Sequence, residues 1–217
     1  MELGVLTDNF PLILDGFVQT LKLLVVSAVF AMLIGTLVAA ARVSPVSILR
    51  TVGAVYVTVF RNTPLFVLLI LTYFGLPQLD IRFSFFTMVT MAMALYTASF
   101  VAEALRSGVN AVPVGQAEAA RAIGLPFGQT MTQVVLPQSF RAVVPPMASV
   151  FIALAKNTSL ASSFGIAEAT ARMDGLLNNN ASARLEVFLG IALGYIIIVE
   201  VISGAAALLE RRWRVER

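Results

Sequence analysis

Lys156 stands inside a long apolar run, where a charged side chain is costly and marks a functional path by default. Three short polar residues follow it directly: Asn157, Thr158 and Ser159. An ammonium group beside hydroxyl and amide groups can hold a carboxylate, as interrupted helices do in membrane transporters. Lys156 lies roughly 15 Å into its apolar run at 1.5 Å per helical residue, which is near the middle of a bilayer. The alternative is that an internal acid, Glu200 or Glu168, neutralises Lys156.

Arg61 is the second cation of this kind, and Asn62, Thr63 and Pro64 follow it. Because a proline lacks the backbone N–H and disfavours helix at the residue before it, this segment should interrupt its helix. Such a break can expose backbone groups toward a solute path. The sequence therefore predicts a path that contains Arg61 and Thr63, although Arg61 extending to the membrane interface is the simpler alternative.

Other chemistries lack the residues that they require. The 217 residues contain no cysteine and no histidine, which removes thiolate catalysis, the usual proton shuttle and most transition-metal sites. The phosphate-binding pattern Gly-x-x-x-x-Gly-Lys-Ser/Thr does not occur either, so this chain has no ATP site of that type. The net charge of +3 comes from basic residues scattered between apolar runs, which argues against nucleic acid as a partner.

The composition predicts a membrane protein. Hydrophobic residues make up 59% of the chain, charged residues only 12%, and the mean hydropathy is +0.89. Since a membrane-spanning helix needs about 20 mostly apolar residues, we expect about five of them. They cover residues 17–41, 52–76, 83–105, 143–166 and 185–209. The expected fold is thus an all-α integral membrane protein with a single domain over residues 1–217.

The distribution of lysine and arginine predicts the orientation. With the N-terminus outside, nine basic residues fall on the inner side: Arg42, Arg50, Arg106, Arg121, Arg141, Arg211, Arg212, Arg214 and Arg217. Three fall outside: Arg82, Arg172 and Arg184. We therefore expect the N-terminus outside and the C-terminus in the cytoplasm.

One cytoplasmic loop, residues 106–142, is too long for a simple connection. Pro113 and Pro126 suit the first turns of two short helices, and Gly124 between them suits a helix stop. Pro137 is expected to end the second short helix before the next span begins after Pro146.

This loop also contains a spaced motif: Glu118, Ala119 and Ala120, then Gly124, then Leu136 and Pro137. It resembles the EAA loop of ABC-importer permeases, with Val134 in place of the usual isoleucine. The resemblance implies that the loop docks on a separate ATPase subunit and transmits its closure to the spans. A loop that merely lies on the membrane surface is the plainer alternative.

Further segments resemble the permeases of polar amino-acid importers: residues 60–65, 111–116 and 156–162. Asn62 departs from this pattern, which has glycine there. The chain as a whole is most similar to glutamate-importer permeases of coryneform actinobacteria. The resemblance implies the type I importer permease fold, location in the bacterial inner membrane, and transport of glutamate or another polar amino acid. The implied partners are a pair of ABC ATPases that bind ATP and Mg²⁺, a second permease subunit and an extracytoplasmic binding protein.

Two other functional classes compete with this reading. A subunit of an ion-coupled secondary transporter would need coupling acids and usually internal repeats, whereas only Glu200 lies deep in a span and no repeat is evident. A membrane enzyme or scaffold is disfavoured because the sequence has no histidine, no cysteine and no cluster of acidic residues within the predicted spans.

Overall fold

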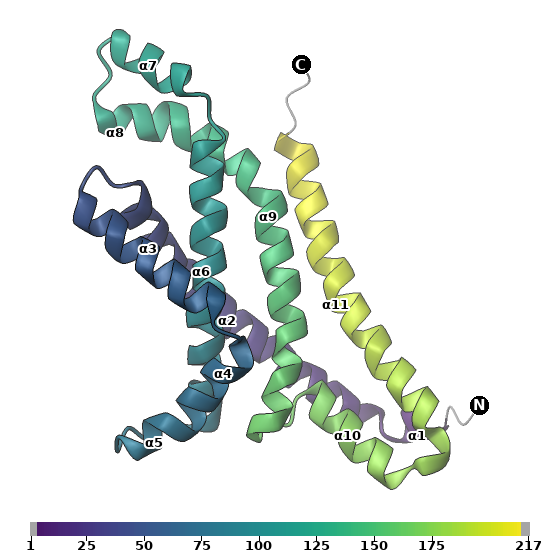
Figure 1. The fold of residues 1–217 in the computed structure, drawn as a ribbon. Helices are drawn as coiled ribbons and strands as arrows, with labels where there is room; N and C mark the ends of the chain where they lie inside the picture. The colour runs from purple at the N-terminus through teal and green to yellow at the C-terminus, as the bar shows by residue number, and fades with distance from the viewer. Residues whose placement is uncertain (1–3, 214–217) are drawn as a thin grey trace.

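The computed structural model describes residues 4–213, and within them every regular element is a helix (Figure 1). The elements run in chain order: α1 (Gly4–Asp8), α2 (Phe10–Val43), α3 (Ser47–Asn62), α4 (Leu65–Ile70), the π-helical η1 (Leu71–Gly75), α5 (Leu76–Gln78), α6 (Phe85–Asn110), α7 (Val114–Ala122), α8 (Phe127–Gln129), the π-helical η2 (Thr130–Val135), α9 (Leu136–Asn157), the 3₁₀-helical η3 (Thr158–Phe164), α10 (Ala169–Asn179), the 3₁₀-helical η4 (Ala181–Ala183) and α11 (Arg184–Trp213). The predicted all-α fold class is confirmed.

Four helical runs are long and apolar enough to cross a membrane, and a bent pair makes a fifth. The bent pair consists of Ser47–Asn62 and Leu65–Gln78, whose axes differ by 99°. Thr63 is extended at the break, with φ −91° and ψ 127°, as expected for the residue before a proline. The predicted interruption of the second span at Thr63 and Pro64 is confirmed.

The beginning of the fourth span differs from the prediction. Helix continues without interruption from Phe127 to Phe164, so Pro137 does not end a separate short helix and the span does not begin after Pro146. Pro137 occupies the second position of α9, directly after the π-helical turns of η2. Figure 1 shows the helix bending there: α8 lies across the top of the bundle, and α9 runs along the length of the bundle. Proline and π-helical turns bend a helix without ending it when neighbouring helices support it.

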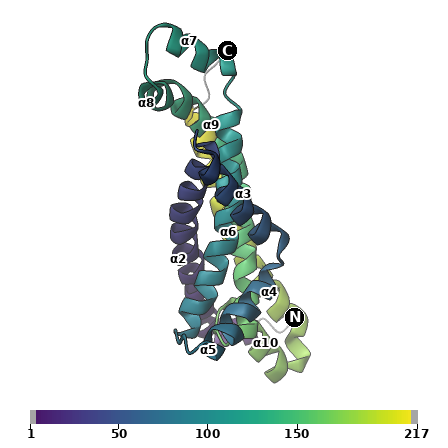
Figure 2. The same cartoon turned by 60° about the vertical axis from the view of Figure 1, so that its left-hand side comes forward.

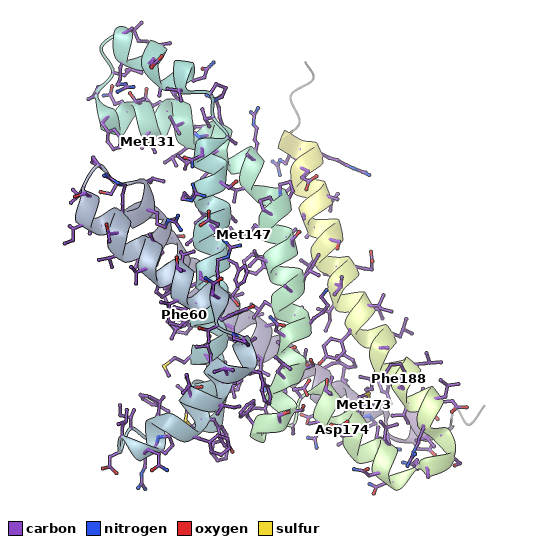
Figure 3. The ribbon with its side chains drawn as sticks, viewed as in Figure 1. Phe60, Met131, Met147, Met173, Asp174 and Phe188 are labelled. Atoms are coloured by element: carbon purple, nitrogen blue, oxygen red, sulfur yellow. The ribbon has the colours of Figure 1, made fainter. Side chains whose placement is uncertain are left out.

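Small side chains let the central helices pack closely. α2 lies along α6, α6 packs against α9, and α9 packs against α11. Between α2, α6 and α9 the buried side chains include Ala31, Ala98 and Val101, together with Met147, which Figure 3 labels. Large apolar side chains on the outside, such as Leu37, suit contact with lipid.

The two ends of the bundle carry different elements. α7, α8 and the end of α11 lie at one end, whereas α1, α5 and α10 lie at the other (Figures 1 and 2). This arrangement agrees with the odd number of crossings expected from the sequence. Arg214 and Arg217, which the orientation argument counts, lie outside the described residues.

Candidate coupling loop and polar cavity

The loop between α6 and α9 forms a sharp helical turn around Gly124. The N–H of Gly124 donates to the carbonyl of Arg121 at 2.9 Å, and the N–H of Leu125 donates to the carbonyl of Ala120 at 3.1 Å. These two bonds form the Schellman arrangement that closes a helix with a left-handed residue. Gly124 has φ +89° and open space around its Cα, so its backbone conformation is what requires glycine. The predicted stop at Gly124 is confirmed.

The rest of the motif divides into a packed part and an exposed part. Ala120 is buried where α7 lies against η2, whereas Glu118 and Ala119 are exposed. Leu136 is half-buried and Pro137 exposed at the beginning of α9. One alanine therefore lets α7 approach the next helix, and the opposite face of α7 stays free to meet another molecule.

Large apolar side chains lie exposed around this motif. Val114 is 70%, Ile123 78% and Phe127 65% exposed. Figure 1 shows α7 and α8 projecting beyond the other helices at this end of the bundle. Exposed large apolar side chains on a projecting element are typical of a protein–protein contact.

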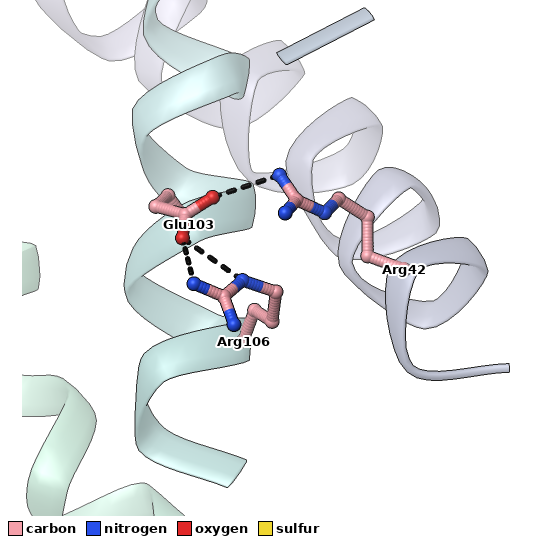
Figure 4. A network of polar contacts seen from close by, with 3 residues as sticks. All are labelled: Arg42, Glu103 and Arg106. Carbon is pink, nitrogen blue, oxygen red and sulfur yellow. Dashed lines mark hydrogen bonds and ion pairs between the residues drawn. The ribbon is translucent and has the colours of Figure 1, made fainter. Parts of the chain in front are cut away.

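A second group of polar residues lies where α2 and α6 meet. The guanidinium of Arg42 on α2 donates to Glu103 Oε2 on α6 at 2.8 Å, and Arg106 Nε donates to Glu103 Oε1 at 2.9 Å (Figure 4). Arg106 follows Glu103 by three positions on the same helix, whereas Arg42 contacts it from another helix, 61 positions away in the chain. Gly53 on α3 makes room for Arg42, because a Cβ there would lie 2.8 Å from Arg42 Cγ.

Arg42 and Glu103 line a polar cavity of about 400 Å³ that Arg61 also lines. The cavity lies between α2, α3 and α6, and its other lining residues are Val57, Thr58, Asn62 and Phe100. The guanidinium carbon of Arg61 lies 5.1 Å from the centroid of the Phe100 ring, which is a cation–π contact. Thr63 is not in this lining, and its hydroxyl donates to the carbonyl of Val59 at 2.8 Å.

Lys156 lies away from this cavity, in the last turn of α9, and its side chain is exposed. Beyond it the helix tightens into η3, where the hydroxyls of Thr158 and Ser159 donate to the carbonyls of Ala155 and Lys156. Thr158 is fully buried, whereas Asn157 is half-buried. Lys156 is therefore the most accessible member of its predicted group, and it forms no ion pair with any residue of the described chain.

Glu168 has other partners than Lys156, so the alternative in which it neutralises Lys156 is wrong. Its carboxylate caps α10 by accepting from the N–H groups of Thr170 and Ala171, each at 2.9 Å. Tyr195 on α11 donates to it at 2.7 Å, and Thr20 on α2 contacts it at 3.4 Å. Burial raises the pKa of Glu168 above its ordinary value, and these backbone and tyrosine donors oppose that shift. The carboxylate thus joins three helices at the end of the bundle opposite the coupling loop.

The fold, the apolar crossings and the projecting loop define a membrane-embedded transport subunit, and comparison with known proteins identifies its family. The chain belongs to the binding-protein-dependent transport system inner membrane components, whose family pattern matches residues 31–215. It is therefore a multi-pass inner-membrane permease subunit, and the ATPase of such a system is a separate chain. The predicted permease class is confirmed over the ion-coupled and enzymatic alternatives.

Individual relatives share nearly the whole length of the chain. The glutamate transport system permease protein GluC of Corynebacterium glutamicum is 42% identical over 203 residues, which cover 88% of this chain and 89% of the relative. The "Probable glutamine ABC transporter permease protein GlnM" of Bacillus subtilis is 34% identical and covers 98% of both chains. A crystal structure of an amino acid ABC transporter with histidines superimposes with a TM-score of 0.90 at 31% identity, covering 98% of this chain and 99% of that one. The resemblance to polar amino-acid permeases is confirmed.

Proposed function

We propose that this chain carries a polar amino acid with an anionic carboxylate, glutamate or glutamine, across the inner membrane. The names of the relatives support this substrate class, because they include a glutamate and a glutamine permease. The proposed path contains Lys156, Asn157, Thr158 and Ser159 at the end of α9, and Arg61 and Thr63 at the break between α3 and α4. Its cations suit a substrate whose carboxylate must leave water.

We further propose that α7 is the element on which an ATPase acts. The observation that carries this proposal is the exposure of the large apolar side chains of Val114, Ile123 and Phe127 on the projecting loop that also contains Glu118. Glu118, Ala119, Ala120, Gly124, Leu136 and Pro137 form the coupling site. Closure of the ATPase would move α7, and the turn at Gly124 would transmit the movement to α9.

The proposed assembly contains a pair of ABC ATPases, a second permease subunit and an extracytoplasmic binding protein. The ATPases bind ATP and Mg²⁺, and this chain needs no cofactor of its own. A second permease, identical or homologous, completes the wall of the path, since five crossings alone enclose little space. In the proposed orientation α7 faces the cytoplasm and α10 faces the outside, which agrees with their positions at opposite ends of the bundle.

The test is purification of the chain from its native host together with its partners, followed by reconstitution of the identified complex in liposomes. We expect an ATPase chain to co-purify and glutamate or glutamine, presented by the binding protein, to stimulate ATP hydrolysis and uptake. The variant Glu118→Ala should retain membrane insertion but lose the stimulation. Stimulated hydrolysis and uptake at the wild-type level in Glu118→Ala would contradict the role of α7.

A further inference from the structure

The polar cavity between α2, α3 and α6 has an excess of positive charge. Glu103 contributes one negative charge, and its two carboxylate oxygens are engaged by Arg42 and Arg106. Arg61 adds a further guanidinium that contacts the Phe100 ring and forms no ion pair in the described part of the chain. The lining thus contains two arginines and one carboxylate, and Arg106 outside the lining engages the same carboxylate, so an additional anion at Arg61 would be attracted rather than repelled.

The cavity is also held in shape from several sides. The Arg42 side chain lies against Gly53 of α3, and Glu103 fixes its guanidinium. The hydroxyl of Tyr56 donates to the carbonyl of Leu95 at 2.7 Å, which fastens α3 to α6 beside the cavity. The Phe100 ring lies against the Arg61 guanidinium. An incoming anion would therefore meet groups that are already in place, which reduces the entropy lost on binding.

The membrane setting restricts what this cavity can face. Charged side chains within spanning segments almost always face a water-filled space or the interior of a bundle, since exposure to hydrocarbon is costly. Arg61, Asn62 and Glu103 gather on one cavity, which concentrates the polar surface of α3 and α6 on one side. This concentration is expected along a solute path and not on a lipid-facing surface.

We propose that this cavity binds the α-carboxylate of the transported amino acid, with Arg61 as the carboxylate ligand. Glu103 acts as a positioning residue that holds Arg42 at the edge of the cavity. The proposal rests on the proposed function, since it requires an amino-acid substrate, and it adds a site separate from Lys156. Asn62 and Thr58 supply neutral polar groups in the same lining. An arginine can bind a carboxylate through two parallel N–H groups, which a lysine cannot do.

The experiment measures equilibrium binding of radiolabelled L-glutamate to the purified permease–ATPase complex in nanodiscs, without the binding protein. The nanodiscs contain only zwitterionic lipid, so that no anionic headgroup competes for Arg61. We expect saturable binding by the wild type and an increase in Kd of about tenfold or more for Arg61→Gln, as for the loss of a charged hydrogen bond. Arg61→Lys should increase Kd severalfold, and Arg82→Gln, the same change outside the cavity, should leave it within twofold.

Unlabelled L-glutamine distinguishes the two carboxylates of glutamate, because it retains only the α-carboxylate. Arg61→Gln should weaken competition by glutamine as much as it weakens glutamate binding. A loss confined to glutamate would overturn the α-carboxylate assignment in favour of the side-chain carboxylate. If the complex with Arg61→Gln fails to assemble, the Kd of the Arg61→Lys complex is the deciding measurement. A Kd equal to that of the wild type would overturn the site.

A parallel uptake assay with the binding protein separates the two proposals. Wild-type uptake combined with an unaltered Kd in the Arg61 variants would overturn the cavity site alone. A wild-type complex that imports no amino acid would overturn the proposed function and this site together. An effect of Arg61→Gln that appears only in nanodiscs with anionic lipid would assign the cavity to an anionic lipid headgroup and overturn the proposal.

Discussion

The hydroxyl of Tyr195 donates to the carboxylate of Glu168 across 2.7 Å, which joins α11 to the first turn of α10. Thr20 of α2 also contacts this carboxylate, so one side chain holds three helices at one end of the bundle. Lys156, in the proposed path, differs from Glu168 because it has no ionic partner in the described chain. We therefore expect Glu168 to contribute to stability and Lys156 to transport.

Replacing Glu168 by alanine should lower the free energy of unfolding by about 2–3 kcal/mol, because it removes the cap of α10 and the contacts of the same carboxylate with Tyr195 and Thr20. The measurement is thermal unfolding of the purified protein in detergent. The control is Asp15→Asn, which breaks the exposed ion pair with Arg172 and should cost at most about 1 kcal/mol. Equal unfolding temperatures for the two variants would contradict the role of Glu168.

The raised pKa of Glu168 predicts a pH dependence of stability. Between the unfolded pKa, about 4.3, and the higher folded pKa, the native state binds the proton more tightly. The contribution of Glu168 should therefore decrease as the pH rises through this window. The difference in unfolding temperature between wild type and Glu168→Gln isolates this effect, and the wild type should lose stability relative to the variant as the pH rises from about 4 through the folded pKa. A difference that increases with pH would contradict the direction of the shift.

Replacing Gly124 by valine should uncouple ATP hydrolysis from uptake while the chain still inserts. A β-branched residue at φ +89° is strained by about 1 kcal/mol or more, so the turn between α7 and α8 should change its shape. Gly128→Ala is the matched control, because Gly128 is helical and has the same open surroundings. Uptake per ATP hydrolysed, measured in proteoliposomes, should fall only in Gly124→Val. Equal ratios in both variants would show that the turn is not needed for coupling.

Replacing Lys156 by methionine should reduce the uptake rate severalfold or more while leaving assembly intact, since the change removes an unpaired cation from the proposed path. Lys22→Met serves as control, because Lys22 is also exposed within a predicted span. Initial uptake rates and the yield of assembled complex are measured for both. Unchanged uptake in Lys156→Met would return Lys156 to a structural role.

Replacing Glu103 by alanine should destabilise the protein more than replacing Arg42 does, by about 1 kcal/mol or more. Among the described residues Glu103 is the only acid that lines the cavity with Arg42 and Arg61, so its loss leaves like charges near one another. Thermal unfolding of the single variants and of the double variant gives the coupling energy of the pair. Additive effects would show that the 2.8 Å contact contributes nothing to stability.

The sequence predicts most of the fold because hydrophobic length is a direct signal for membrane crossing. The break at Thr63 and Pro64 and the turn at Gly124 were also predictable, since proline and glycine act through local backbone sterics. The continuous helix through Pro137 was not, because tolerance of a proline depends on π-helical turns and on neighbouring helices. The sequence around Pro137 indicates neither the π-helical turns nor the neighbouring helices.

The candidate sites could be predicted only where they depend on residue type and spacing. Lys156 and Arg61 were identified because a charge in an apolar run is conspicuous. The contact of Arg42 with Glu103 spans 61 positions and requires the packing of α2 on α6, which no local pattern contains. The partners of Glu168 likewise come from distant helices, although its place before the first turn of α10 was a possible capping signal.

The helix from Phe127 to Phe164 is uninterrupted but bent, so it is one continuous element with two arms. Its 38 residues extend for about 57 Å, nearly twice the hydrocarbon thickness of a bilayer. One arm begins beside the turn at Gly124 and the other ends just beyond Lys156, with the elbow at η2 between them. If an ATPase rotates the first arm, as proposed above, the second arm can move with it without melting any helical turn.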